Sequence, residues 1–125
     1  MTKISAGLKT LFLVHFIVGL IFGLIYLLIP GTFLGMLGVT LEDSFPYRTI
    51  GAAVLAFSAS SWYCYRAAEW EKVKIVVQAE IVWTVLAALV GLYGLLILAQ
   101  PAAYWINVII MAGFAAAFSY FYSKA

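Results

Sequence analysis

Glu80 is the residue in this sequence with the most evident capacity for chemistry. It stands six residues beyond Lys74, inside an apolar run of membrane-spanning length. A carboxyl group is costly at membrane depth, so such an acid usually faces a cavity or a partner and is a functional candidate by default. Glu80 would then carry a proton or bind a ligand. The plainer alternative, slightly favoured, is that it is hydrated near the interface or pairs with Lys72 or Lys74, one or two helical turns back.

His15 is the second polar residue inside an apolar run. His15, Gly19 and Gly23 recur every four residues and therefore share one face of a helix. The GxxxG spacing of the two glycines lets another helix approach closely, so this face points at protein. His15 is a proton carrier, a ligand or an interhelical hydrogen-bond donor, and the last role is favoured. One histidine supplies one ligand, so neither haem nor metal is predicted, and the single Cys64 excludes an internal disulfide.

His15 and Glu80 fall at similar depth when their helices are laid out at about 1.5 Å per residue. We therefore predict that they face each other, with hydroxyls from Ser58, Ser61 and Ser119 at the same level. If the cost of burying charge dominates, the pair is a neutral acid bonded to a neutral imidazole; if attraction dominates, it is an ion pair. We favour the neutral pair, because no second basic group is in reach.

Arg48 and Asn107 are candidates nearer the opposite membrane face. Arg48 at a helix mouth suits an anionic head group or substrate. The favoured alternative is an arginine that extends to the interface and pairs with Glu42 or Asp43. No phosphate-binding glycine loop, nucleophile elbow, HExxH motif or pair of catalytic carboxylates is present, so we predict no enzyme, no catalytic residue and no cofactor.

The composition indicates whether the helices are surrounded by water or by lipid. Hydrophobic residues make up 66% of the chain, charged residues only 10%, and the mean hydropathy is +1.11. A soluble domain carries about a quarter charged residues. The composition therefore predicts an integral membrane protein, with the lipid bilayer as its partner. The net charge of +2 is too small to indicate a nucleic-acid partner.

We predict one all-α domain over residues 1–125, an integral membrane four-helix bundle. Its 125 residues suffice for four spans of about 20 residues with short connections. A short interfacial helix is expected within Pro30–Leu41, where proline suits a helix start. Arg48, Ala52, Ala56 and Ser60 would form a packing face on the second span. The predicted spans are residues 8–29, 47–65, 73–98 and 103–122.

The basic residues predict the orientation. Arg48 alone falls on one side of the four-span arrangement, and six basic residues fall on the other. Cytoplasmic loops carry the excess of lysine and arginine, so we expect both termini and the central loop in the cytoplasm, across a prokaryotic cytoplasmic membrane. The six residues are Lys3, Lys9, Arg66, Lys72, Lys74 and Lys124.

The first half of the chain resembles a known group of proteins. A first span ends in the segment Leu28-Ile29-Pro30-Gly31-Thr32-Phe33-Leu34-Gly35-Met36-Leu37-Gly38, and a second opens with Tyr47-Arg48-Thr49-Ile50-Gly51-Ala52. This pattern is similar to the DoxX-like group of small four-span membrane proteins and related uncharacterised families of bacteria and archaea. The resemblance implies a four-span fold and, as in a few members of the group, a link to quinone or redox complexes.

These observations lead to one functional hypothesis and one alternative. The first is a non-enzymatic membrane protein that binds a lipid-like or quinone-like molecule in a polar intramembrane pocket, or packs as a homo-oligomer or as a subunit of a larger membrane complex. The alternative is a small proton-coupled transporter that acts as an oligomer through Glu80.

Overall fold

The structure is a computed structural model that describes residues 2–125, and these residues form α-helices joined by short connections. The all-α prediction is confirmed. A helix covers each of the four predicted ranges, with ends that differ by a few residues, and a fifth, short helix lies where the interfacial helix is expected. The elements are α1 (Ala6–Leu28), α2 (Pro30–Met36), α3 (Phe45–Arg66), α4 (Trp70–Leu96), the 3-10 turn η1 (Ala102–Tyr104) and α5 (Trp105–Lys124).

The first two helices begin and end at residues with a clear local reason. The Ser5 side chain accepts a hydrogen bond from the Leu8 N–H at 3.2 Å and caps the start of α1. Pro30 disfavours helical geometry at the residue before it, so α1 ends there, and Pro30 itself opens α2. After α2 the chain turns at Gly38, whose φ of +84° glycine adopts at low cost.

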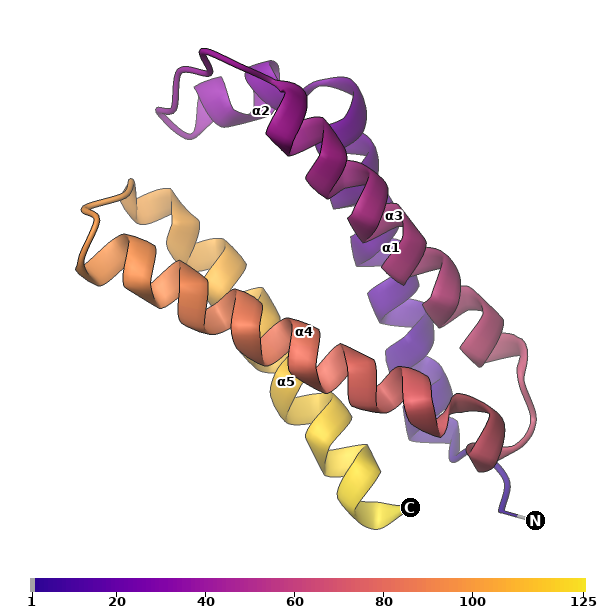
Figure 1. Ribbon diagram of the computed structural model, residues 1–125. Coiled ribbons are helices and arrows are strands. Elements are labelled where there is room, and N and C mark those ends of the chain that lie inside the picture. The colour runs from indigo at the N-terminus through magenta and orange to yellow at the C-terminus, as the bar shows by residue number, and fades with distance from the viewer. Residues whose placement is uncertain (1) are drawn as a thin grey trace.

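Helices α1 and α3 form a closely packed antiparallel hairpin (Figure 1). A Cβ at Gly19 would lie 3.0 Å from Ser58 Cβ, and one at Gly51 would lie 2.6 Å from the Leu27 backbone nitrogen. The backbones therefore approach closely where side chains are small. The face of α3 that packs is not the predicted one. Ala52 and Ala56 are exposed, and the buried residues of α3 are Gly51, Ser58, Ser61 and Cys64.

Helices α4 and α5 form the second hairpin, with Gly91 against Val108. The two hairpins converge where the chain termini and the α3–α4 connection lie, and they diverge towards α2 and the α4–α5 connection (Figure 1). The apolar core lies at the convergent end, so the four long helices do not pack together along their whole length. Its buried members are Ile4, Leu8, Leu11, Phe12, Cys64, Trp70, Val73, Val77, Phe114 and Phe118.

The N-terminal segment ties the two hairpins together at this end. The Ile4 N–H donates to the Ala68 carbonyl at 3.2 Å, and the Trp70 N–H donates to the Thr2 carbonyl at 2.9 Å. The residues before α1 thus pair with the connection between α3 and α4, and they hold the first turn of α4 beside the start of α1.

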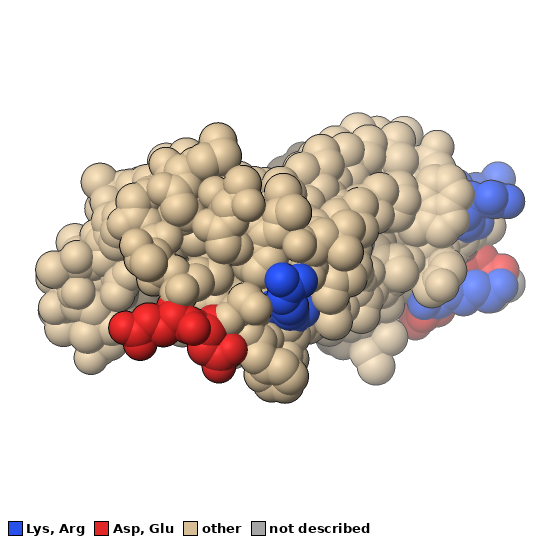
Figure 2. Space-filling model, turned by 90° about the horizontal axis from the view of Figure 1, so that it is seen from above, with Lys and Arg blue, Asp and Glu red and all other residues tan. Residues whose placement is uncertain are grey.

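Within residues 2–125, three helices are long and apolar enough to cross a membrane, which indicates a membrane protein. Mean hydropathy over their most apolar windows is 2.7, 2.1 and 1.6. The predicted span 47–65 is not among them, because the serines and Arg48 make α3 more polar. Charged side chains form separate groups on the surface, with uncharged surface between them (Figure 2). The three helices are Ala6–Leu28, Trp70–Leu96 and Ala102–Lys124.

Candidate functional site

The two hairpins meet in a buried contact between His15 of α1 and Glu80 of α4. The distance from His15 Nε2 to Glu80 Oε2 is 3.1 Å, and the exposed fraction is 5% for His15 and 0% for Glu80. The predicted juxtaposition of the two residues is therefore present in the structure. The favoured alternative, a hydrated Glu80 or one paired with Lys72 or Lys74, is wrong: Glu80 is shielded from solvent, and Lys72 instead lies 3.5 Å from Glu69.

Ser61 of α3 extends this contact to a third helix. Its Oγ lies 2.7 Å from His15 Nδ1, and its exposed fraction is 0%. Three side chains thus form a continuous polar chain, from Ser61 through the imidazole to Glu80. Whether Ser61 donates to Nδ1 or accepts from it depends on the imidazole tautomer, so the chain is compatible with a proton on either side of the ring.

Helix α5 completes the surroundings of the imidazole with aromatic rings. The His15 ring lies edge-on to Phe114 at 4.8 Å and to Phe118 at 5.5 Å between centroids. Each of the four long helices therefore contributes a side chain around His15. The aromatic contacts fix the plane of the ring. Ser61 is hydrogen-bonded to its Nδ1, and the Glu80 carboxyl group lies beside its Nε2 without hydrogen-bond geometry.

The carboxyl group of Glu80 is not satisfied by its surroundings. Oε2 is close enough to His15 Nε2 for an ion pair, yet neither Oε1 nor Oε2 has a partner of hydrogen-bond geometry among residues 2–125. A short distance alone does not make a hydrogen bond, so the contact with His15 leaves the carboxyl group unsatisfied. A polar group buried without a hydrogen-bond partner is costly, and a ligand that supplies the missing donors would remove that cost.

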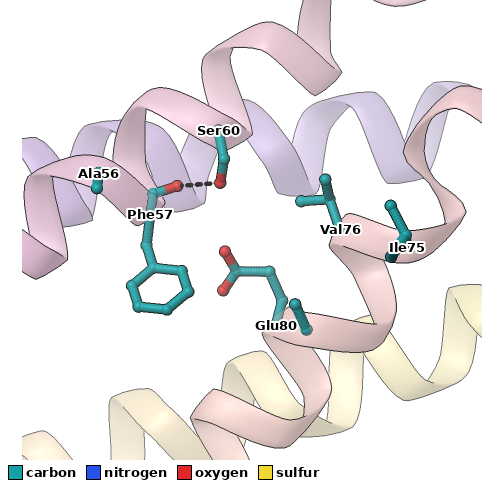
Figure 3. A pocket seen from close by; sticks show the side chains of 7 residues that line it. Ala56, Phe57, Ser60, Ile75, Val76 and Glu80 are labelled. Carbon is teal, nitrogen blue, oxygen red and sulfur yellow. Dashed lines mark hydrogen bonds between the residues drawn. The ribbon is translucent and has the colours of Figure 1, made fainter.

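The pair lies between two cavities. The larger, about 460 Å³, opens between the hairpins and includes His15 in its wall. The smaller, about 330 Å³, lies between α3 and α4 and includes Glu80 (Figure 3). Phe57 lines both cavities and stacks on Trp83 at 5.2 Å with an angle of 5°. The larger cavity is otherwise lined by Val18, Gly19, Phe22, Tyr26, Tyr47, Ile50, Val54, Leu86, Ala87, Val90, Gly91, Asn107, Ile110, Met111 and Phe114.

Arg48 does not pair with the acids as predicted. Its Nη1 donates to the Leu27 carbonyl at 2.6 Å, and its Nε donates to Ser44 Oγ at 3.1 Å. Asp43 instead accepts from the Phe45 N–H at 2.9 Å. The carbonyls at the end of α1 lack helical partners and carry partial negative charge, so the guanidinium caps that helix. Arg48 lies apart from the His15–Glu80 pair.

The remaining predicted polar residues divide between the cavity and other surfaces. Asn107 is exposed and lines the larger cavity. Ser58 donates to the Phe16 carbonyl at 2.6 Å and serves helix packing. Ser119 is exposed and is not part of the site. Trp83 was not singled out from the sequence, although its position three residues after Glu80, close to the same face of α4, was a usable signal.

Among residues 2–125 no group of three or more His, Cys, Asp or Glu side chains is arranged to hold a metal ion. What the site offers is an imidazole, a carboxyl group and a hydroxyl in contact, between an aromatic cavity and an apolar one. Comparison of the chain with models of protein families, with curated proteins and with solved structures found no match.

Proposed function

We propose that the protein crosses the membrane four times, with both termini in the cytoplasm. Helix α3 has 22 residues, about 33 Å, close to the roughly 30 Å of a bilayer core. It packs along α1, which is apolar enough to span. The excess of basic residues at the convergent end of the hairpins supports the orientation. Membership of the DoxX-like group is part of this proposal, supported by the order of a span, Pro30 and a short helix before α3.

The function that the geometry supports best is binding of a lipid-like or quinone-like molecule in the larger cavity. The observation that carries this proposal is a cavity of about 460 Å³ with aromatic walls and His15 on its lining. Ligand sites are commonly apolar clefts of roughly 300–1,000 Å³ with a few polar groups that orient the ligand. Phe57 and Trp83 offer flat surfaces for a ring, and His15 and Asn107 offer hydrogen bonds to a ring oxygen.

Hydrolysis is the less suitable use of the Ser61–His15–Glu80 chain, although its residue types are those of a catalytic triad. Acyl transfer needs free backbone N–H groups or other donors beside the nucleophile to bind the oxyanion. Ser61 lies inside α3, where the helix engages the backbone N–H groups, and it is fully buried. We therefore propose that Ser61 and Glu80 orient the His15 imidazole, and that these three side chains exchange protons with a bound ligand without forming a covalent intermediate.

Tryptophan quenching tests the proposal. The purified protein in lipid nanodiscs is titrated with a short-chain quinone, which quenches a nearby indole. Quenching should saturate in the wild type, and Trp83→Phe should remove the saturable part. Ala87→Leu fills the cavity and should abolish saturation, whereas Ala112→Leu, on the exposed face of α5 outside the cavity, should not. Quenching that increases linearly in every variant would mean that the quinone only dissolves in the lipid.

A second candidate is a proton-coupled transporter that acts as an oligomer through Glu80. The observation that favours it is a buried carboxyl group, without hydrogen-bond partners among the described residues, between two cavities. Liposomes with an imposed pH gradient test it. Proton flux that appears with the wild type and vanishes with Glu80→Gln supports transport, and equal flux in the two argues against it.

A further inference from the structure

The smaller cavity between α3 and α4 is distinct from the aromatic one and has a different chemistry. Its wall is apolar apart from Glu80 and Ser60, and Figure 3 shows the Glu80 carboxyl group directed from α4 towards Phe57 and Ser60 of α3. The apolar part of the lining comes from Ala56, Phe57, Ile75, Val76 and Ala79.

When Glu80 is ionised, the polar end of this cleft presents hydrogen-bond acceptors without donors. The Ser60 hydroxyl donates its hydrogen to the Phe57 carbonyl at 2.7 Å, so its Oγ is left as an acceptor. An ionised carboxylate only accepts, and neither oxygen of Glu80 has a hydrogen-bond partner within the described part of the chain. A ligand that complements these oxygens must therefore bring several donors.

The charged groups around Glu80 indicate which charge a ligand of this cleft should carry. His15 is the one basic side chain within 4.0 Å of Glu80 among residues 2–125, since Lys72 contacts Glu69. The buried thiol of Cys64 on α3 also lies within range of the Glu80 charge. A metal ion needs several oxygen ligands, and this cleft supplies one carboxylate. An organic cation with N–H groups supplies both the hydrogen-bond donors and the positive charge.

We propose that this cleft binds a lipophilic primary ammonium ion, which exchanges with a proton on the Glu80 carboxyl group. In the empty cleft Glu80 holds the proton. When the ammonium ion binds, the carboxyl group releases that proton to the aqueous phase, and the three N–H groups are shared between the carboxylate and Ser60 Oγ. The alkyl chain then lies against Ala56 and Ala79. Because Glu80 is shielded, a lining side chain must move aside, and Ile75, which is 72% exposed, has room to do so.

A hydrophobic carbodiimide tests this site independently of the aromatic cavity. Dicyclohexylcarbodiimide adds to protonated carboxyl groups reached from lipid, and mass spectrometry locates the adduct. In nanodiscs made with phosphatidylcholine, a lipid without a primary amine, we expect an adduct on Glu80 and none in Glu80→Gln. Decylammonium should protect Glu80, and decanol, which has the same chain length without the charge, should not. Because one proton competes with one ammonium ion for Glu80, each fall of one pH unit should raise the decylammonium concentration needed for half protection, by about tenfold at most.

Cavity-filling variants keep the carboxyl group and close the cleft. Ala79→Leu should prevent both the adduct and its protection, whereas Ala116→Leu, exposed on α5 outside the cleft, should behave as the wild type. Adding phosphatidylethanolamine identifies the source: protection by this lipid alone means that the ammonium group is a head group, and no protection means a free amine. The proposal is overturned if Glu80 forms no adduct, if decanol protects as well as decylammonium, or if Ala79→Leu changes nothing. Failure of quinone quenching leaves these outcomes unaffected.

Discussion

Removal of either partner of the His15–Glu80 contact should reveal which form the pair takes. We consider His15→Phe, Glu80→Met and the double variant, because phenylalanine and methionine keep most of the volume and remove the polar atoms. His15→Phe leaves Glu80 without its 3.1 Å neighbour and removes the 2.7 Å contact to Ser61. A buried neutral group left without a partner costs about 1–3 kcal/mol, and the lost bond to Ser61 about 1 kcal/mol.

The size of the loss in unfolding free energy, and of the coupling energy, distinguishes a neutral pair from an ion pair. For a neutral acid beside a neutral imidazole, the single variant His15→Phe should cost about 2–4 kcal/mol. The coupling energy between the two sites should then not exceed about 1 kcal/mol, the value of one ordinary hydrogen bond, because the contact lacks hydrogen-bond geometry. If both groups are charged, His15→Phe strands a buried carboxylate, and the loss should approach 3–5 kcal/mol before the bond to Ser61 is added. We expect the smaller values, because no aligned donor stabilises a carboxylate at Glu80.

Glu80→Met tests most directly whether the carboxyl oxygens destabilise the fold. It removes the unpartnered oxygens, so it should be neutral or stabilising, and it should recover part of the loss in the double variant. Reversible unfolding in detergent or bicelles, followed by far-UV circular dichroism or steric trapping, gives the four free energies of unfolding. Losses that simply add in the double variant would mean that the two residues do not interact. Coupling of about 3 kcal/mol or more would refute the neutral pair.

Three further predictions concern topology, packing and capping. In a cysteine-free background, Ser44→Cys should react with an impermeant thiol reagent from outside and Lys72→Cys only from inside; the reverse pattern would invert the proposed orientation. Gly19→Leu should lower thermal stability by forcing α1 away from α3, because even a Cβ at this position would lie 3.0 Å from Ser58 Cβ. Leu24→Ala, on the exposed face of α1, should matter less, and equal effects would contradict the packing. Arg48→Gln should lower the free energy of unfolding by less than about 1 kcal/mol, because solvent screens an exposed helix cap. Arg48→Lys, which keeps the charge, is the control. A loss of stability equal to that of Gly19→Leu would mean that Arg48 does more than cap α1.

The sequence was sufficient to predict the positions of the helices and the central contact. Apolar runs bounded by Pro30, by the charged connection and by Gln100-Pro101 leave little freedom in where the helices lie. Helical rise then places His15 and Glu80 at one level, and the glycines after His15 indicate the face that meets protein. Depth along the membrane normal is a local property of each helix, which is why the sequence can supply it.

The lateral arrangement could not be obtained in the same way. Depth does not say which helices are neighbours, so the divergence of the two hairpins and the larger cavity were not predicted. The packing face of α3 was placed one position away from Gly51, because a stripe of alanines and a stripe with a glycine look alike in one sequence. Arg48 was assigned to the nearest acids, whereas its partner is the Leu27 carbonyl, 21 residues away. The sequence also gives no sign that both oxygens of Glu80 lack hydrogen-bond partners among the described residues.

The backbone hydrogen bonds that join Ile4 to Ala68 and Thr2 to Trp70 make the convergent end a pivot. For helices about 30 Å long, a rotation of about 10° between the hairpins displaces their far ends by roughly 5 Å. His15 stands nine residues after the start of α1, about 14 Å from that end, so the same rotation displaces it by roughly half as much. A rotation of one hairpin against the other about this end would therefore widen the far end of the larger cavity about twice as far as it separates the polar contact.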